Sequence, residues 1–174
     1  ELKEHEILMK NKVLDYSSPN STILDIGCAD GLFISEVAKE LPKALVTGID
    51  ISSKLIAAAN AKECQNCSFL VEDAEKFEPN KKFDLIIASG ILSVFDNFDL
   101  ILNQWTSWLE KNGRLIIFGR FNANDIDVKV SFRNNFKNSD WEGGLTSYSI
   151  KTIGRFLDNL KFKYEFSKFL FSGD

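Results

Sequence analysis

The amino-acid sequence predicts an α/β fold, a doubly wound and mostly parallel sheet with helices on both faces. Short apolar runs of strand length alternate with longer segments in which apolar residues recur every three or four positions. Such alternation is typical of strand–helix–strand units, which build parallel sheets. The length of 174 residues suits one domain with a sizeable core. We therefore expect a single domain over residues 1–174.

The elements follow in order along the first two thirds of the chain. An N-terminal helix is expected over residues 1–18. Pro42 ends the helix after the first strand, and the Asn112–Gly113 turn leads into the fifth strand. The fourth run, FDLIIA, suits a strand that is covered on both faces. Strands are expected at residues 23–26, 44–49, 68–71, 83–88 and 114–118, and helices at 32–41, 53–62 and about 98–110.

The last third of the chain breaks this rhythm. Residues 120–147 are polar and rich in Asn, without a clean period, and are expected to be irregular. Residues 148–160 have helical spacing. Alternating aromatic residues then predict a sixth strand that bulges or ends near Lys168. The domain would thus comprise an N-terminal helix (1–18), a core (21–119), an irregular segment (120–147), and a final helix and strand (148–174).

The composition narrows the classes of function. The formal net charge of −4 argues against a broad nucleic-acid footprint. No apolar run approaches the ~20 residues that a membrane-spanning helix needs. No signal peptide is visible. We expect a cytoplasmic protein, monomeric or homodimeric, with no nucleic-acid or membrane partner.

The cysteines raise the question of a metal or redox site. Cys64-Gln-Asn-Cys67 has the spacing of a zinc or redox pair. No second pair exists, and His5, the only histidine, is distant in sequence, so a four-ligand zinc site lacks ligands. We therefore expect no metal, and two reduced thiols near the start of a strand.

The segment Asp25-Ile26-Gly27-Cys28-Ala29-Asp30-Gly31 stands at a predicted strand-to-helix turn. Gly27 lets the backbone turn tightly and lets a ligand approach it closely. The helix that follows offers unpaired N–H groups and a positive dipole end to a carboxylate or hydroxyl group. The alternative is that Gly27 and Gly31 are ordinary turn glycines and that Asp25 caps the turn.

Two further acidic residues follow predicted strands. Asp50 lies 50 − 27 = 23 residues after Gly27, close to the ~20 expected of an acid that binds ribose hydroxyls. Asp73-Ala74 comes just after the third strand, where a carboxylate could accept from an adenine amino group. Acidic residues are common in loops, so neither aspartate alone identifies a ligand site. The prediction of a ligand site rests on the spacing of the three motifs taken together. All three motifs are expected at the carboxyl edge of the sheet.

These motifs resemble those of the class I S-adenosylmethionine-dependent methyltransferases, most closely members that act on small molecules. ILDIGCADG is similar to their first motif, GIDIS to the second, VEDAEKF to the third, FDLIIASGILSVFDN to the fourth, and LEKNGRLIIFG to the segment through the fifth strand. The resemblance covers about residues 21–119. It implies a Rossmann-like fold whose sheet usually has seven strands, of which six are recognisable here.

The resemblance also implies a cofactor, S-adenosyl-L-methionine, and a role for each motif residue. Asp50 would bind the ribose, and Ile51 would pack on the adenine face. Asp73 would hydrogen-bond the adenine amino group, Ala74 would offer its N–H to the ring, and Ser89 would help hold the methionine amine. The first-motif residues, which would line the methionine part, are Asp25, Gly27, Cys28, Ala29 and Gly31.

Two positions depart from the family pattern. Ala29 stands where the family usually has its middle glycine, which costs little if the backbone there keeps a negative φ. Ser93 stands where many small-molecule members have His or Gln after the fourth strand, so no catalytic base is assigned. The Asn-Pro-Pro-Tyr-type motif of nucleic-acid methyltransferases is absent from the fourth segment, which counts against base methylation.

The resemblance implies transfer of the sulfonium methyl group to an O, N or C atom of a small-molecule acceptor by in-line displacement, with S-adenosyl-L-homocysteine as product. Residues 120–147 and the N-terminal helix would cover the acceptor. The alternatives are a non-catalytic S-adenosylmethionine-binding regulatory domain and an NAD(P)-dependent oxidoreductase, whose G-x-G-x-x-G fingerprint fits poorly. Candidate acceptor-binding residues, each with packing or solvation as the alternative, are Phe95, Arg120, Arg133 and Trp141.

Overall fold

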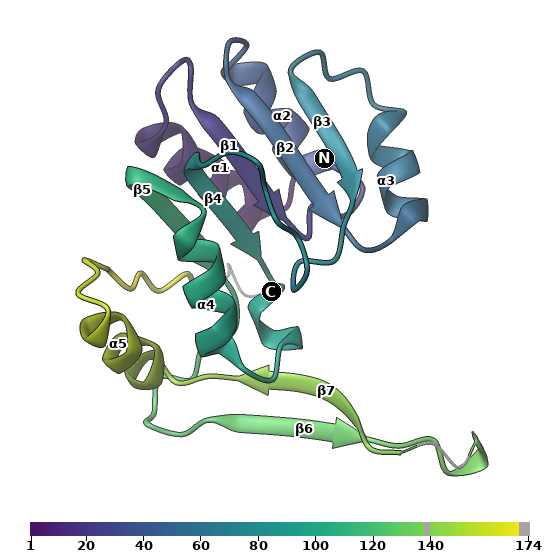
Figure 1. The fold of residues 1–174 in the computed structure, drawn as a ribbon, viewed down its shortest axis with the longest axis vertical. Helices are drawn as coiled ribbons and strands as arrows, with labels where there is room; N and C mark the ends of the chain where they lie inside the picture. The colour runs from purple at the N-terminus through teal and green to yellow at the C-terminus, as the bar shows by residue number, and fades with distance from the viewer. Residues whose placement is uncertain (138–139, 171–174) are drawn as a thin grey trace.

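The computed structural model describes residues 1–137 and 140–170. Its centre is a five-stranded parallel sheet with the strand order β3-β2-β1-β4-β5 (Figure 1). The order reverses between β1 and β4, where sheets of this kind bind ligands. The predicted α/β class with a mostly parallel sheet is confirmed. The strands are β1 (Thr22–Ile26), β2 (Leu45–Asp50), β3 (Cys67–Val71), β4 (Phe83–Ser89) and β5 (Leu109–Phe118).

The helices begin and end at the residues that local chemistry favours. The α3 helix starts after Ser52, whose hydroxyl accepts from the Leu55 N–H, and α5 starts after Ser149, which accepts from the Thr152 N–H. The helices are α1 (Glu4–Tyr16), α2 (Leu32–Glu40), α3 (Ser53–Asn60), α4 (Phe98–Ser107) and α5 (Ile150–Asn159), with single 3₁₀ turns η1 (Leu92–Val94) and η2 (Asn135–Lys137).

Both faces of the sheet are buried, each in its own hydrophobic cluster. Alternate residues of one strand enter opposite clusters: Ile23 packs with α1, α2 and α3, whereas Leu24 packs with α4. Leu85 and Ile86 of β4 divide in the same way. This double coverage explains why the central strands read as apolar runs rather than as alternating patterns.

β5 begins earlier than predicted. The predicted helix at 98–110 ends at Ser107, and Leu109 already pairs with Phe83 of β4. The register then shifts before Arg114 pairs with Leu85, so the predicted turn at Asn112–Gly113 falls inside an irregular stretch of β5. The sequence of that stretch signals a turn, but pairing to β4 determines its structure.

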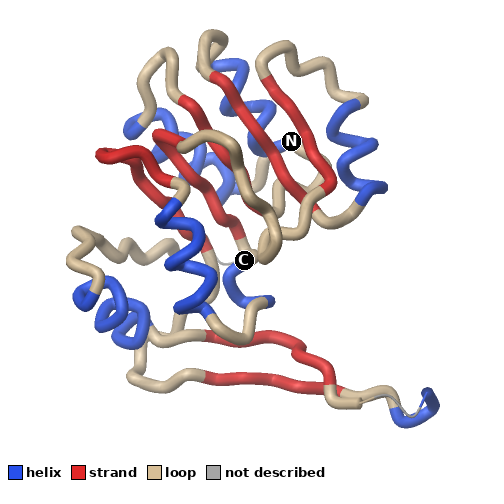
Figure 2. The backbone as a smooth tube through the Cα atoms, in the orientation of Figure 1, coloured by secondary structure: helices blue, strands red, loops and turns tan. Residues whose placement is uncertain are grey.

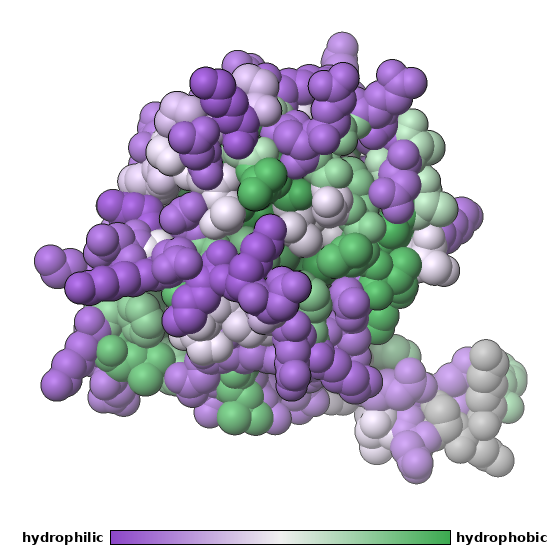
Figure 3. Space-filling view, turned by 45° about the horizontal axis from the view of Figure 1, so that its top comes forward, coloured by the Kyte–Doolittle hydropathy of each residue, from purple (hydrophilic) through white to green (hydrophobic). Residues whose placement is uncertain are grey.

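The prediction that residues 120–147 are irregular is wrong for two parts of that range. β6 (Val128–Phe132) pairs antiparallel with β7 (Glu142–Ser147), forming a separate two-stranded ribbon. The ribbon projects from the body of the molecule (Figure 2), and its far end stands apart in the space-filling view (Figure 3). Its polar Lys129 pairs with Asp96 of the body, while Val130 is 51% exposed.

The predicted sixth strand near the C-terminus is also wrong. Residues 161–170 form no strand, and Phe171, the last of the aromatic residues in this segment, lies outside the described residues. Glu165 of this segment accepts a hydrogen bond from the Tyr16 hydroxyl at the end of α1. Tyr164 packs beside Gly154 of α5. Tyr164 thus contacts a helix instead of pairing in the sheet.

The prediction of two reduced thiols is likewise wrong. Cys64 and Cys67 form a disulfide, because the turn between α3 and β3 brings their Cα atoms to 5.3 Å. Cys28 is a free, buried cysteine. No helix in the described part of the chain is both long and apolar enough to cross a membrane.

Candidate functional site

The carboxyl ends of β1, β2 and β3, with the loop after β4, enclose a pocket of about 400 Å³. This volume lies within the usual range for small-molecule sites. The predicted first, second and third motifs all contribute to it. The lining residues are Gly27, Ile49, Asp50, Ile51, Glu72, Asp73, Ala74, Glu75, Ile91, Val94, Phe95 and Asp96.

Asp50, at the end of β2, joins two parts of the pocket wall. One carboxylate oxygen accepts from the Ala29 N–H at 3.0 Å, and the other accepts from the Ser52 N–H at 2.9 Å. The first bond fixes the turn after β1, and the second fixes the start of α3. Each carboxylate oxygen keeps a further lone pair for a ligand hydroxyl.

The turn after β1 uses left-handed backbone at three alternate positions. The φ angles are +72° at Gly27, +50° at Ala29 and +73° at Gly31. The N–H groups of Gly27 and Cys28 both donate to the Ile49 carbonyl, at 2.8 and 3.0 Å, which ties the turn to β2. Ala29 therefore does not keep the negative φ that would make it a neutral replacement for glycine, and its side chain costs about 1–2 kcal/mol.

Replacing Ala29 with glycine is expected to raise the free energy of unfolding by about 1 kcal/mol, because the left-handed strain is removed. Urea unfolding followed by circular dichroism would measure the change. Ala57→Gly in α3 is the matched control, and it should lower stability by about 1 kcal/mol because helical backbone disfavours glycine. A loss of stability in Ala29→Gly would contradict the positive φ at this position.

Gly27 sits against Ile91 from the loop after β4. A Cβ built on Gly27 would lie 2.6 Å from Ile91 Cδ1, so any side chain at position 27 would collide with that residue. Gly27 and Ile91 both line the pocket, and the Ile91 side chain packs directly on the glycine backbone. Position 27 therefore favours glycine, because its φ is +72° and because Ile91 packs on it.

Asp25 lies beneath the pocket. Its side chain is 3% exposed and is not among the residues that line the cavity. Burial and the nearby charge of Asp50 raise the pKa of Asp25 to about 8. Asp25 is therefore largely protonated at neutral pH, and it can donate a hydrogen bond as well as accept one.

Asp73, at the end of β3, is an ionised carboxylate at the pocket rim. One oxygen accepts from the Glu75 N–H at 3.0 Å, and the other pairs with Lys76 at 3.0 Å. These two contacts lower the pKa of Asp73 below its ordinary value. Ala74 lines the pocket beside it, and Ile51, opposite, is 72% exposed.

Two other predicted residues point elsewhere. The Ser89 hydroxyl, at the end of β4, donates to the Met9 sulfur of α1 at 3.7 Å and does not line the pocket. Burial and nearby carboxylates raise the pKa of the Cys28 thiol, which packs over Gly48 of β2. The N-terminal helix α1 packs against α2 and β5 and contributes nothing to the pocket lining.

The four candidate acceptor-binding residues fall in three places. Phe95 lines the pocket, with its ring edge-on to Trp105 at 5.7 Å between centroids. Arg120 lines a separate small cleft beyond η1. Arg133 stacks over the Trp141 ring at 5.2 Å; both lie beyond the paired part of the β6–β7 ribbon, and neither lines the pocket. The structure thus brings only Phe95 to the site.

The structure adds residues to the site that lie within the third and fourth motifs but were given no role there. Ile91, Val94 and Asp96 come from the loop after β4, and Glu72 and Glu75 flank Asp73. Of the described lining residues, five carry carboxylates and none is Lys or Arg. Glu72 and Glu75 could have been found by their place next to Asp73. Within the described ranges, no three His, Cys, Asp or Glu side chains are grouped so that they could hold a metal ion.

A parallel α/β sheet with a glycine turn after β1 and acidic residues after β2 and β3 defines a nucleotide-binding class of domain. The chain belongs to the methyltransferase domain family, whose family model matches residues 17–163. The family resemblance drawn from the motifs is thereby confirmed.

Individual proteins that the chain resembles are methyltransferases as well. Malonyl-[acyl-carrier protein] O-methyltransferase 2 of Ilyobacter polytropus is 31% identical over 141 residues, which are 79% of this chain and 53% of the relative. The plantazolicin methyltransferase BpumL, solved in complex with SAH, is 28% identical, with a TM-score of 0.59 over 67% of this chain and 45% of that one. The chain spans about half the length of the curated relatives it matches.

The fold extends over almost the whole chain in another solved structure. The DhpI–SAM–HEP complex superposes with a TM-score of 0.68 over 91% of this chain and 78% of that chain. At 16% sequence identity this likeness concerns the fold alone. It includes the region after β5, where the motifs give no guidance.

Proposed function

We propose that the pocket binds S-adenosyl-L-methionine and that the domain transfers its methyl group to a small-molecule acceptor. The observation that carries this proposal is the acidic lining of the pocket. Five of the described lining residues carry carboxylates and none is Lys or Arg, although Lys76 and Lys129 from outside the lining pair with Asp73 and Asp96. Such a site attracts a ligand that has a sulfonium charge, an ammonium group and ribose hydroxyls. It would repel the pyrophosphate of a nicotinamide dinucleotide, which disfavours the oxidoreductase alternative.

The residues present suit each part of this cofactor. Asp50 would accept from the ribose hydroxyls, and Ile51 would cover one face of the adenine. Asp73 would accept from the adenine amino group, with the Ala74 N–H available to the ring. The first-motif turn, with Gly27 under Ile91, would hold the methionine part.

The bound cofactor supplies a methyl group on a sulfonium sulfur, which is already a good leaving group. The task of the protein is then to align an acceptor atom with that methyl group, and orientation of this kind can lower a barrier by ~7–11 kcal/mol. Ile91, Val94 and Phe95 form the apolar wall beside which we place the acceptor. No general base is assigned, and none is needed when the acceptor atom is already a nucleophile.

The proposal of a small-molecule acceptor is supported by the relatives. They include the malonyl-[acyl-carrier protein] O-methyltransferase above and a pavine N-methyltransferase of Thalictrum flavum, which is 28% identical over 122 residues. We leave the acceptor atom open between O, N and C. The cytoplasmic location, the monomeric or homodimeric state and the absence of a nucleic-acid partner stay predictions.

Calorimetric titration with S-adenosylmethionine and, separately, with NADH tests the proposal. We expect the first ligand to bind and the second not to bind. Asp50→Ala should weaken binding of S-adenosylmethionine at least about tenfold, because hydrogen bonds to a charged group are lost. Asp15→Ala, on the exposed side of α1, is the matched control and should bind as the wild type does.

Two results would change this conclusion. Binding of NADH, or failure of both ligands to bind, would overturn the cofactor assignment. Binding of S-adenosylmethionine without transfer to any acceptor in a screen of amines, phenols and carboxylic acids would favour the non-catalytic binding domain instead.

A further inference from the structure

One short segment between α3 and β3 holds both ends of α2. Lys62 Nζ donates to the Asp30 carboxylate at 2.8 Å and to the Asp30 carbonyl at 2.9 Å. Asp30 belongs to the turn that precedes α2, and Gly27 of the same turn lines the pocket. The Lys62 bond is the first cause of the lowered pKa of Asp30. Lys62 thus fixes the amino-terminal side of α2.

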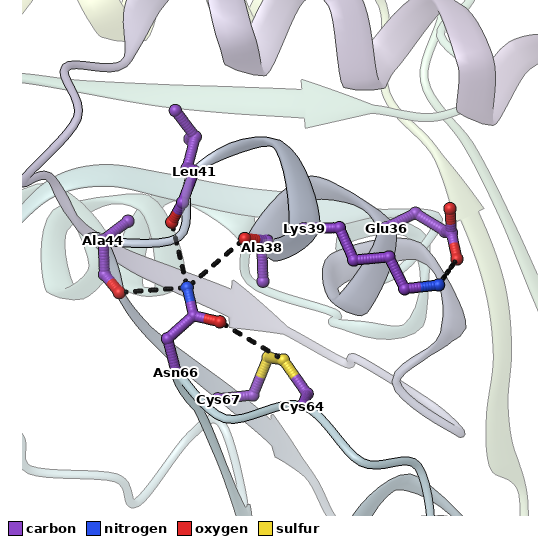
Figure 4. The surroundings of a disulfide bond; sticks show 8 residues. All are labelled: Glu36, Ala38, Lys39, Leu41, Ala44, Cys64, Asn66 and Cys67. Carbon is purple, nitrogen blue, oxygen red and sulfur yellow. Dashed lines mark hydrogen bonds and ion pairs between the residues drawn. A yellow bond between two sulfur atoms is a disulfide. The ribbon is translucent and has the colours of Figure 1, made fainter.

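Asn66 holds the other end of the same helix. Its side-chain Nδ2 donates to three carbonyl oxygens where α2 finishes, as Figure 4 shows. These carbonyls belong to Ala38 at 3.4 Å, Leu41 at 2.9 Å and Ala44 at 3.2 Å. The helix that begins at the glycine turn is therefore anchored at both ends by residues 62–66.

The Cys64–Cys67 disulfide closes this segment around Asn66 (Figure 4). Both cysteines are partly exposed, so a reductant can reach them. Cys64 is two residues from Lys62, and Cys67 is the first residue of β3. Neither cysteine lines the pocket, so the disulfide can act on the ligand only through the segment that it closes.

We propose that Cys64–Cys67 is a thiol–disulfide redox site that sets, through Lys62, how tightly the glycine turn binds S-adenosylmethionine. This inference rests on the proposed function. The closed disulfide restricts the loop that begins two residues after Lys62, and through this loop it limits the positions from which the Lys62 side chain reaches Asp30. A turn that is held before the ligand arrives binds more tightly, because less conformational freedom is lost on binding.

The redox step balances with a dithiol as reductant. A thiolate of the dithiol attacks one sulfur of the disulfide and forms a mixed disulfide, and its second thiol then displaces the protein sulfur. Two electrons and two protons pass to the protein, which gains two thiols, while the reductant becomes its own disulfide. The new Cys64 thiol then has a hydrogen to donate to Asn66 Oδ1, which lies 3.7 Å from Cys64 Sγ.

Reduction should therefore act mainly on the Lys62 end of the segment. Asn66 keeps its three carbonyl partners and gains a thiol donor, whereas the loop that begins two residues after Lys62 is no longer closed. Lys62 is a positioning residue in this scheme, because it contacts the turn and not the ligand pocket. Lys62 and Asp30 side chains are 33% and 46% exposed, so the expected effect on binding is modest.

Calorimetric titration of the chain with S-adenosylhomocysteine, in the oxidised form and after treatment with dithiothreitol, tests the inference. We expect the Kd to rise about fivefold on reduction, as loss of a partly exposed ion pair would give. Thiol titration under denaturing conditions should count one thiol before reduction and three after it. The double variant Cys64→Ser/Cys67→Ser should bind like the reduced form and should not respond to dithiothreitol.

Variants of Lys62 test whether this residue acts by holding the Asp30 turn in position or only through the general stability of the protein. Lys62→Met should bind weakly in both redox forms and lose the response, while Lys62→Arg should restore tight binding and the response. Lys39→Met is the matched control, since Lys39 pairs with Glu36 on the outer surface of α2. It should keep both the affinity and the redox response.

Three results would overturn the inference. Equal Kd values in the oxidised and reduced forms would do so, and the proposed function would stand. A redox response that persists in Lys62→Met would also overturn the inference, and so would three free thiols in the oxidised protein. In both cases the proposed function would stand. If no form of the chain binds S-adenosylhomocysteine, the proposed function fails, and this inference fails with it.

Discussion

Gly31→Ala is expected to lower the free energy of unfolding by about 3 kcal/mol, through left-handed strain and overpacking together. The φ angle of Gly31 is +73°, where any side chain is strained. A Cβ there would lie 2.8 Å from two ring carbons of Phe69 and 2.9 Å from the Ala59 Cβ. The added methyl group would push α3 and β3 away from the turn.

Comparison with a second glycine separates the cost of left-handed strain from the cost of overpacking. Gly90 has nearly the same φ, +72°, but a Cβ built on it would have no neighbour within 4 Å. Gly90→Ala should therefore cost only the strain, about 1 kcal/mol. Urea unfolding of both variants would give the difference. Equal losses in the two variants would show that the close packing around Gly31 contributes nothing.

Asp25 should make the protein less stable as the pH rises. Its pKa in the folded protein is about 8, against an ordinary value near 3.8. Between these two values the unfolded chain releases the proton while the folded chain keeps it, so the folded state is progressively disfavoured. The contribution is fully present below the ordinary pKa and is lost by about pH 8, at about 1.4 kcal/mol per pH unit.

Comparison with Asp25→Asn isolates this contribution, because asparagine has nearly the same shape and does not titrate. Over the whole window the wild type should lose up to about 6 kcal/mol relative to the variant. Asp30 and Asp73, whose pKa values are lowered, act in the opposite direction, but they cancel in the difference. Unfolding free energies measured across the window would test the prediction. A constant difference between the two proteins would contradict the raised pKa.

The sequence predicts the central sheet well, because its signals are local. Each of the first four strands is a short apolar run, and Pro42 or a capping serine marks the adjacent helix ends. The motif order then places Gly27, Asp50 and Asp73 at one edge. The structure gathers those three around one pocket without further information.

The later part of the chain could not be predicted from local signals. Val128 and Val130 do alternate with polar residues, but their side chains face outward and are 45% and 51% exposed, so the pattern marks no buried face. In the C-terminal segment the aromatic alternation is present, yet Tyr164 packs on α5 instead of pairing with a strand. In both cases contacts between elements, rather than a local hydrophobic period, determine the structure.

Several features of the site also depend on tertiary contacts and could not be predicted from local sequence signals. The sequence shows that Ala29 stands where the family usually has glycine. The positive φ of Ala29, however, depends on how the turn docks against β2. Ile91, Val94 and Asp96 line the pocket because the chain folds back after β4. Their residue types alone do not predict this position. The role of Lys62 has the same origin, since its partner Asp30 is 32 residues earlier in the chain.

The anchoring of α2 has a consequence for the order of folding. Its turn and its last carbonyls depend on Lys62 and Asn66, which follow their partners by 32 and up to 28 residues. A chain emerging from the ribosome therefore carries the complete glycine motif well before it carries the residues that hold it. The ligand-binding turn reaches its final shape only after this long loop has closed, a step that is slow compared with formation of α2 itself.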